Sequence, residues 1–269
     1  MTLTARHPVI DIRRTARSLL RSPRLLRQRI ADRDRKTFQC PICGYAGAFL
    51  DFGARFSTGT RRHAECPGCG SVERHRLLWL ALDVLAKERP FKSLRVLHFA
   101  PEGSLRRRLS SIFATYHTAD LQAPNVDYNV DMCDLPFPAE TFDLVMACHV
   151  LEHIRDTSRA LNSLSRVLSR SGVAILPVPI VRATTIEYAE PNLYEHGHVR
   201  APGLDFYDTY RVVFPAVDIV RSRDCEQCFQ TWIYEDRTHF PTSELPFRQS
   251  IPGERHEEFI PLCYKIDRA

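Results

Sequence analysis

Short apolar runs alternate with amphipathic segments through the middle of the chain. The runs at residues 94–99, 115–119, 143–149 and 173–178 have the length of buried strands. Residues 103–113 and 156–169, which lie between these runs, repeat their apolar positions with the period of a helix. Near-continuous apolar strands separated by such helices are typical of a parallel sheet that is covered on both faces. The pattern therefore predicts an α/β fold with a doubly wound sheet.

A longer amphipathic segment precedes this region. Residues 71–90, with the sequence SVERHRLLWLALDVLAKERP, have a broad apolar face and end at Pro90. Proline cannot continue a helix, so the pattern predicts one helix that stops there. We expect it to connect an N-terminal module to the main domain.

The N-terminal module is predicted from its cysteines. The strings CPICG and CPGCG place two CxxC pairs 22 residues apart, with an alternating, aromatic-containing segment between them that fits a short hairpin. Two such pairs complete a tetrahedral zinc site, and a site closed by four thiolates is structural. The predicted zinc ligands are Cys40, Cys43, Cys66 and Cys69. Two disulfides or four unrelated thiols are the alternatives. The later pair, Cys225 and Cys228, has no glycine and no second half, which favours two ordinary thiols over metal or redox chemistry.

The charge is concentrated in an N-terminal arm. Residues 1–36 hold eleven basic and three acidic side chains, whereas the whole chain holds 37 and 32, which leaves 26 basic and 29 acidic for the rest. Leucines among the arginines predict short amphipathic helical turns broken near Pro23. Docking on the main domain, contact with nucleic acid, and binding to an acidic membrane surface or organelle targeting all remain open for this arm.

Composition limits the class of protein. A chain of 269 residues that is 44% hydrophobic is long enough for one α/β domain and a small module. No apolar run reaches the length of a membrane span, and the N-terminus lacks the apolar core of a secretory signal. We therefore expect no membrane span and a cytoplasmic location. The expected organisation is a basic arm at 1–36, a zinc ribbon at 37–72, a connecting helix at 73–92 and the α/β domain at 93–269.

Acidic residues follow two of the predicted strands. Asp120 ends the second strand and Asp131 follows one strand later. Ligands of doubly wound sheets bind beyond the carboxyl ends of the strands, where a carboxylate can accept both ribose hydroxyls and another can accept the adenine amine. The spacing therefore predicts an adenosine-containing cofactor.

The strings DMCDLPFPAETFDLVMACHVLEHI and RALNSLSRVLSRSGVAILPVP resemble class I S-adenosylmethionine-dependent methyltransferases. The resemblance covers residues 94–180 closely and implies a Rossmann-like, seven-stranded doubly wound sheet. It also implies that the cofactor is S-adenosylmethionine. Together with the paired CPxCG strings, it is similar to a narrower bacterial group of zinc-ribbon methyltransferases.

The resemblance assigns cofactor contacts to the ends of the first, second and fourth strands. Aligned with the family's acidic residue and glycine-rich turn, RVLHFAPEGSL places His98 at the acidic position, Ala100 at the first glycine and Glu102 at the second. Glu102 would bind the ammonium group of the cofactor. The remaining implied contacts are Asp120 and Leu121 at the ribose, Asp131 and Met132 at the adenine, and Cys148 beside the methyl group.

Histidines are the candidates for catalysis, because a methyl acceptor loses a proton as it attacks. His149 and His198 are the predicted catalytic residues. His153, His196 and Arg200 are predicted to contact the substrate, because YEHGHVR follows the fifth strand in a region that covers substrate in this class of fold.

The preferred function is methyl transfer to a small-molecule or glycan acceptor. The alternatives are methylation of rRNA or another nucleic acid, and a non-catalytic zinc-ribbon protein that binds nucleic acid through the basic arm.

Overall fold

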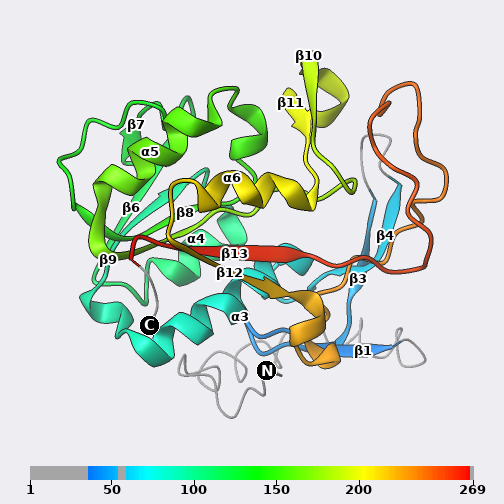
Figure 1. The fold of residues 1–269 in the computed structure, drawn as a ribbon. Coiled ribbons are helices and arrows are strands. Elements are labelled where there is room, and N and C mark those ends of the chain that lie inside the picture. The colour runs from blue at the N-terminus through cyan, green and yellow to red at the C-terminus, as the bar shows by residue number, and fades with distance from the viewer. Residues whose placement is uncertain (1–35, 54–58, 267–269) are drawn as a thin grey trace. The chain divides into compact units, whose positions relative to one another are not determined.

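A computed structural model describes residues 36–53 and 59–266 (Figure 1). The predicted arm therefore lies outside the described residues, except for Lys36. The chain divides into two compact units, which we describe separately. Unit 1 comprises Met1–Glu88, Val220–Arg237 and Pro252–Glu258, and unit 2 comprises Arg89–Ile219, Thr238–Ile251 and Phe259–Ala269.

Unit 2 is built on a seven-stranded sheet whose order is β12-β13-β9-β8-β5-β6-β7. Strands β5 to β9 pair in parallel, and β13 pairs antiparallel with β9. The strand order reverses between β5 and β8, which makes their carboxyl ends the topological switch point where ligands bind in such sheets. The strands are β5 (Arg95–Phe99), β6 (Thr115–Asp120), β7 (Tyr128–Asn129), β8 (Phe142–Ala147), β9 (Leu168–Ile175), β12 (Ala216–Arg221) and β13 (Phe259–Tyr264).

Helices cover both faces of this sheet. In Figure 1, α5 (Thr157–Val167) and α6 (Asp208–Arg211) lie on one face and α4 (Gly103–Leu109) lies on the other. Leu161 and Leu164 of α5 share one buried core with Tyr210 of α6 and Val145 of β8. A chain that places helices on both faces buries both sides of its parallel strands, as their apolar sequences require. The doubly wound α/β fold predicted from the sequence is confirmed.

A hairpin follows the fifth strand of the sheet in unit 2. Strands β10 (Ile186–Asn192) and β11 (His198–Ala201) pair antiparallel and project from the sheet (Figure 1). Between them lies the 3-10 helix η3 (Leu193–Glu195), which ends at His196 in the left-handed backbone region. The YEHGHVR segment singled out in the sequence therefore forms the tip and returning strand of this hairpin.

Unit 1 holds two small hairpins and one long helix. Strand β1 (Thr37–Gln39) pairs with β2 (Ala46–Ala48), and β3 (Leu50–Gly53) pairs with β4 (Thr60–Glu65). Helix α3 (Glu73–Glu88) starts after the second cysteine pair and confirms the helix predicted over residues 71–90. Its side chains are buried on nearly all sides.

The units are not continuous along the chain, in contrast to the predicted division into 37–72, 73–92 and 93–269. Segment Val220–Arg237 belongs to unit 1 because its backbone pairs with the ribbon: the Arg62 amide donates to the Tyr234 carbonyl at 2.8 Å. The Gln230 carbonyl accepts from Arg76 Nε at 2.8 Å, and the Gln230 side-chain amide donates to the His63 carbonyl at 3.0 Å. These pairings join residues more than 150 positions apart, and no local pattern in the sequence reports them.

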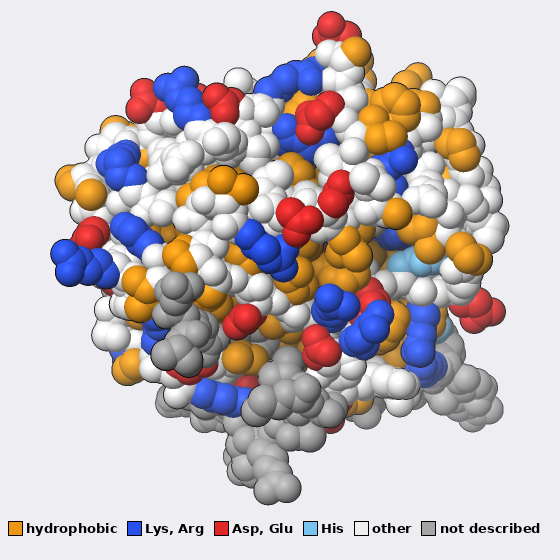
Figure 2. All heavy atoms as spheres, viewed as in Figure 1, with side chains coloured by type: hydrophobic (Ala, Val, Ile, Leu, Met, Phe, Trp, Pro, Cys, Tyr) orange, Lys and Arg blue, Asp and Glu red, His pale blue; other side chains and the backbone are white. Residues whose placement is uncertain are grey.

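The surface of the described residues mixes both charges. Figure 2 shows basic and acidic side chains interspersed on the displayed face. This agrees with the near balance of 26 basic and 29 acidic residues outside the arm. Of the helices in residues 36–53 and 59–266, none combines the length and apolar character that crossing a membrane demands.

A buried carboxyl in unit 1 makes stability depend on pH. Burial raises the pKa of Glu258 from 4.5 to about 7. Between these values the folded state holds a proton that the unfolded state has released, so the free energy of unfolding falls as pH rises. We expect wild-type protein to lose about 2 to 3 kcal/mol between pH 5 and pH 8 relative to Glu258→Gln, because one pKa unit corresponds to about 1.4 kcal/mol.

Urea unfolding of both proteins at the two pH values measures this difference. Glu254→Gln is the matched control, because Glu254 lies in the same segment with its side chain 86% exposed. Parallel pH dependence in wild type and Glu258→Gln would contradict the assignment.

Candidate functional site

The four cysteines of the paired CPxCG strings converge in unit 1. Their sulfurs all lie within 4.8 Å of one another, with Cys40 and Cys69 at 3.7 Å and Cys43 and Cys66 at 3.6 Å. Zinc–sulfur bonds of about 2.3 Å in tetrahedral geometry separate the sulfurs by about 3.8 Å. The spacing therefore fits a four-thiolate metal centre.

The backbone around these cysteines repeats in the two strings. The amide of Gly44 donates to the Cys40 carbonyl at 2.9 Å, and that of Gly70 donates to the Cys66 carbonyl at 2.8 Å. Both glycines have φ in the left-handed region, at 75° and 73°. A side chain is strained in that conformation, which explains why each string ends in glycine. The two turns present their thiols in the same way, as paired metal knuckles do.

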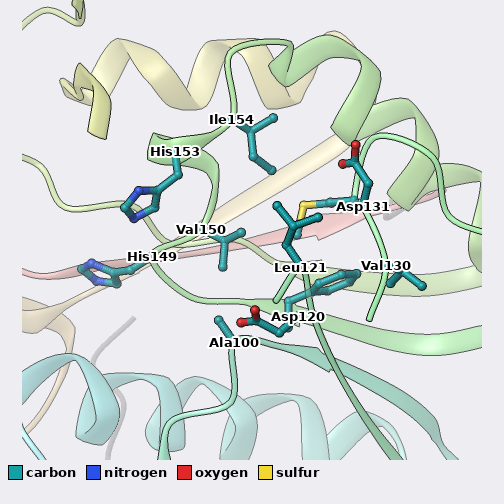
Figure 3. A pocket seen from close by; sticks show the side chains of 11 residues that line it. Ala100, Asp120, Leu121, Val130, Asp131, His149, Val150, His153 and Ile154 are labelled. Carbon is teal, nitrogen blue, oxygen red and sulfur yellow. The ribbon is translucent and has the colours of Figure 1, made fainter. Parts of the chain in front are cut away.

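A cavity of about 330 Å³ opens at the switch point of the sheet in unit 2. Its walls come from the carboxyl ends of β5 and β6 and from the segments that follow β5, β6, β7 and β8. Figure 3 shows His149 and His153 together at one end of the cavity, with Val130 and Asp131 at the other. The lining side chains are Phe99, Ala100, Asp120, Leu121, Val130, Asp131, Met132, His149, Val150, His153 and Ile154.

The two predicted carboxylates both line this cavity. Asp120 Oδ1 accepts backbone amides of Gln122 and Ala123 at 2.9 Å each, which fixes the carboxylate at the end of β6. Asp131 Oδ1 accepts the Cys133 amide at 2.8 Å. In each case one carboxylate oxygen accepts from the backbone of the turn that follows. The structure thus places two oriented carboxylates in the wall of the cavity.

The turn after β5 has a left-handed backbone conformation that glycine usually adopts, but the residue at this position is alanine. Ala100 lines the cavity with φ of +45°, and its amide donates to the Ala119 carbonyl at 2.8 Å. Alanine has the smallest side chain that can tolerate this region, so the backbone still approaches the cavity closely. Glu102 is the N-cap residue of α4 and is half-buried. It is not among the residues that line the cavity, and its contact with the cofactor ammonium stays a prediction.

His98 and Cys148 lie behind the cavity wall. His98 is fully buried, and its Nδ1 is 2.7 Å from the Tyr116 hydroxyl. Cys148 is 5% exposed. Neither side chain is among those that line the cavity. His98 thus joins β5 to β6 through this hydrogen bond, and its contact with the cofactor stays a prediction.

The histidine end of the cavity contains a buried carboxylate. The Glu152 side chain is 1% exposed, and its Oε1 lies 3.6 Å from His149 Nδ1 and 3.8 Å from His198 Nε2. The ring centroids of His153 and His198 are 4.7 Å apart in an edge-to-face arrangement. Glu152 belongs to the LEH string, of which only His153 was predicted to form part of the site. The acidic residue beside this histidine, which lies in the first turn of η2 (Leu151–His153), could have indicated the cluster.

The electrostatics of His198 argue against its predicted role as general base. Burial and, to a lesser extent, the neighbouring His153, Arg248 and His196 together lower the pKa of His198 to about 3. A general base works best when its pKa is near the working pH. At neutral pH this imidazole is therefore neutral and too weakly basic to take a proton efficiently. Burial also lowers the pKa of His153.

Arg200 turns inward from the hairpin. Its side chain is 2% exposed, and its Nη1 donates to the carbonyls of Leu151 and Ile154 at 2.6 and 2.7 Å. Nε donates to Glu187 at 2.7 Å and Nη2 to the Arg155 carbonyl at 3.1 Å. The guanidinium thus ties β11 to the LEH turn that carries two cavity residues. His196 is exposed at the hairpin tip and does not line the cavity.

Replacing Arg200 by lysine is expected to destabilise unit 2. One ammonium cannot reach all four acceptors, and a buried hydrogen bond to a charged group contributes about 1.5 to 3 kcal/mol. We expect Arg200→Lys to lower the free energy of unfolding by about 2 to 4 kcal/mol in urea titrations. Glu187→Gln, at a side chain that is 56% exposed, removes one charge from the same cluster and should cost far less. Unchanged stability with an impaired acceptor KM would instead place Arg200 at the acceptor.

The apolar residues that line the cavity were not predicted from the sequence. Phe99, Val130, Val150 and Ile154 line it but look like ordinary core residues in the sequence. In the sequence, only their position at or near the ends of strands could have indicated that they line a cavity. Such residues supply the apolar surface on which a flat ring can pack.

Comparison with known proteins agrees with this geometry. Residues 103–176 match a family model described as "Methyltransferase domain". The match is confined to this segment of unit 2. The segment contains α4, β6, β7, β8, α5 and β9, and so covers most of the cavity wall. With the sheet order described above, unit 2 has the Rossmann-like fold of class I methyltransferases.

Several solved structures are similar to the chain. A S-adenosylmethionine-dependent methyltransferase from Mesorhizobium loti is 15% identical, covering 70% of this chain and 97% of that chain at a TM-score of 0.43. Phosphoethanolamine N-methyltransferase 2 from Haemonchus contortus is 19% identical, covering 52% and 38% at a TM-score of 0.41. The [4+2]-cyclase SpnF is 16% identical, covering 66% and 70% at a TM-score of 0.44. No curated protein matches the sequence.

Proposed function

We propose that this protein transfers a methyl group from S-adenosylmethionine to a small-molecule or glycan acceptor. The observation that carries the proposal is the cavity at the switch point, lined by Asp120 and Asp131 within the segment that matches a methyltransferase domain. Bound S-adenosylmethionine supplies an electrophilic methyl group on its sulfonium.

In this proposal, different residues of the cavity wall contact different parts of the cofactor. The Asp120 carboxylate accepts the ribose hydroxyls, and Asp131 accepts the adenine amine while Met132 and Leu121 pack against the ring and the sugar. The left-handed turn at Ala100 lets the backbone approach the amino-acid end of the cofactor. The protein then acts chiefly by holding donor and acceptor in line, which is a large part of catalysis in bimolecular transfers.

The acceptor belongs at the histidine end. His149 and His153 line that end, opposite Asp131 (Figure 3). His149 keeps its proposed catalytic role, because it lines the cavity and its Nδ1 lies 3.6 Å from Glu152 Oε1. A cavity of about 330 Å³ favours a small acceptor, or a single sugar unit of a glycan, over a folded nucleic acid.

The paired CPxCG strings are proposed to hold a structural zinc ion. Support comes from the sulfur spacing and from the two matching turns of unit 1. Four cysteines leave no coordination position for a substrate, so this metal would stabilise the fold rather than take part in methyl transfer.

Titration calorimetry followed by an acceptor screen tests the function. We expect S-adenosylmethionine and S-adenosylhomocysteine to bind with one site per chain. The protein should then label a panel of sugars and hydroxylated metabolites from methyl-labelled cofactor, and leave rRNA unlabelled. Absence of cofactor binding by folded protein would reject the methyltransferase proposal, and labelling confined to RNA would reject the acceptor class.

A further inference from the structure

A buried carboxylate and three imidazoles meet at the acceptor end of the cavity in unit 2. They come from separate parts of the chain: His149 from the turn after β8, Glu152 and His153 from η2, and His198 from the first position of β11. Arg200 fixes β11 to this turn through the carbonyls of Leu151 and Ile154. The cluster is therefore held by the fold.

The spacing of the polar atoms is that of ligands around one ion. One ligand atom each of Glu152, His153 and His198 lies within 4.8 Å of the others. Glu152 Oε1 is 3.6 Å from His149 Nδ1 and 3.8 Å from His198 Nε2. These separations are longer than hydrogen bonds, which reach about 3.2 Å. Ligands with bonds of about 2.0 to 2.2 Å to a shared metal ion lie roughly 3 to 4 Å apart.

We propose that Glu152, His153 and His198 bind a divalent transition-metal ion. Two imidazoles and one carboxylate are a recurrent ligand set for zinc and for other first-row transition metals. A cation would also interact favourably with the negative charge of this buried carboxylate. The mixed nitrogen and oxygen set distinguishes this site from the all-sulfur centre of unit 1.

The position of the proposed metal site also indicates which functional group of the acceptor is methylated. This extension rests on the proposed methyltransferase function. His153 lines the cavity, so an ion held by His153 and Glu152 would face the acceptor. A bound ion favours an acceptor with a hydroxyl group, and a second neighbouring oxygen would let the acceptor chelate it.

The transfer step balances without any redox change. The acceptor hydroxyl, held on the ion, releases its proton to water. The oxygen forms a bond to the methyl carbon while the carbon–sulfur bond breaks and its electron pair returns to sulfur. The products are the methyl ether and S-adenosylhomocysteine, and the metal keeps its charge.

Cobalt(II) is a selective probe of this site. Protein already holding one zinc per chain is titrated with Co²⁺ and monitored by visible absorption and by metal analysis after gel filtration. We expect one Co²⁺ per chain with ligand-field bands and without the intense thiolate-to-cobalt bands that the cysteine centre would give. Hyperfine-shifted imidazole N–H resonances in the wild-type NMR spectrum should report the histidine ligands directly. No bound Co²⁺, or binding without these resonances, would overturn the proposal.

Substitutions of the proposed ligands show where the ion binds. Glu152→Gln and His198→Ala should weaken Co²⁺ binding roughly 100-fold or more, since even partners outside the coordination sphere contribute about 10- to 100-fold. His239→Ala is the matched control, an exposed histidine of the same unit outside the cluster. Equal affinity in Glu152→Gln and wild type would refute the assignment.

Cofactor binding without added metal separates this proposal from the function on which its acceptor chemistry rests. S-adenosylmethionine binding with no Co²⁺ site would leave the methyltransferase standing and remove the metal. A Co²⁺ site without cofactor binding would keep the metal site and remove the methyltransferase.

Discussion

Replacing Cys66 by serine is expected to abolish zinc binding in unit 1 and to unfold its ribbon. The four sulfurs close a site in which each thiolate is one of four ligands, and small metal-built modules have too little apolar core to fold without the ion. Zinc-finger peptides gain about 10 to 16 kcal/mol from their metal, so a loss on the order of 5 kcal/mol or more is expected here. Metal analysis of purified protein and thermal unfolding of the whole chain measure both effects.

Cys228→Ser is the matched control for this experiment. Cys228 belongs to the same unit, is exposed and lies outside the four-sulfur cluster. It should leave one zinc per chain and an unchanged unfolding curve. The hypothesis of a structural zinc ion fails if wild-type protein purified without chelators contains no metal. It also fails if Cys66→Ser retains the metal.

Replacing Asp120 by alanine is expected to weaken S-adenosylmethionine binding by about 1.5 to 3 kcal/mol, the range for losing a charged hydrogen-bond partner. This corresponds to an increase in Kd of roughly 10- to 150-fold. The carboxylate is held at the end of β6 by the amides of Gln122 and Ala123, so it is oriented before the ligand arrives. Titration calorimetry with S-adenosylhomocysteine measures the change.

Two further variants show whether the effect is electrostatic. Asp120→Asn keeps an oxygen for the two backbone amides and removes the charge, so it should lose most of the affinity while keeping the turn. Asp134→Ala removes a carboxylate that is 82% exposed and does not line the cavity, and should bind as wild type does. An unchanged Kd in folded Asp120→Ala would show that the cofactor does not bind in this cavity.

The sequence alone predicted the elements and the ligands that depend on local pattern. Strands β5, β6, β8 and β9 and helices α3 and α5 lie where the apolar periods placed them, to within a few residues at their ends. Strand β9 begins earlier than predicted because Leu168 pairs with Phe142, a contact set by the neighbouring strand. Asp120 and Asp131 line one cavity and the four cysteines converge, as their sequence pattern led us to expect, because strand ends and CxxC spacing fix their positions within a few residues.

Tertiary structure decided everything that depends on residues distant in sequence. The sequence did not show that residues 220–237 join the ribbon, that Arg200 binds the LEH turn, or that His98 faces Tyr116 instead of the cavity. It also did not reveal Glu152 as the centre of a histidine cluster, because His149 and His198 reach it from different strands. Apolar periodicity reports which side of an element is buried, whereas the contacts of a buried polar group depend on which element the fold packs against it.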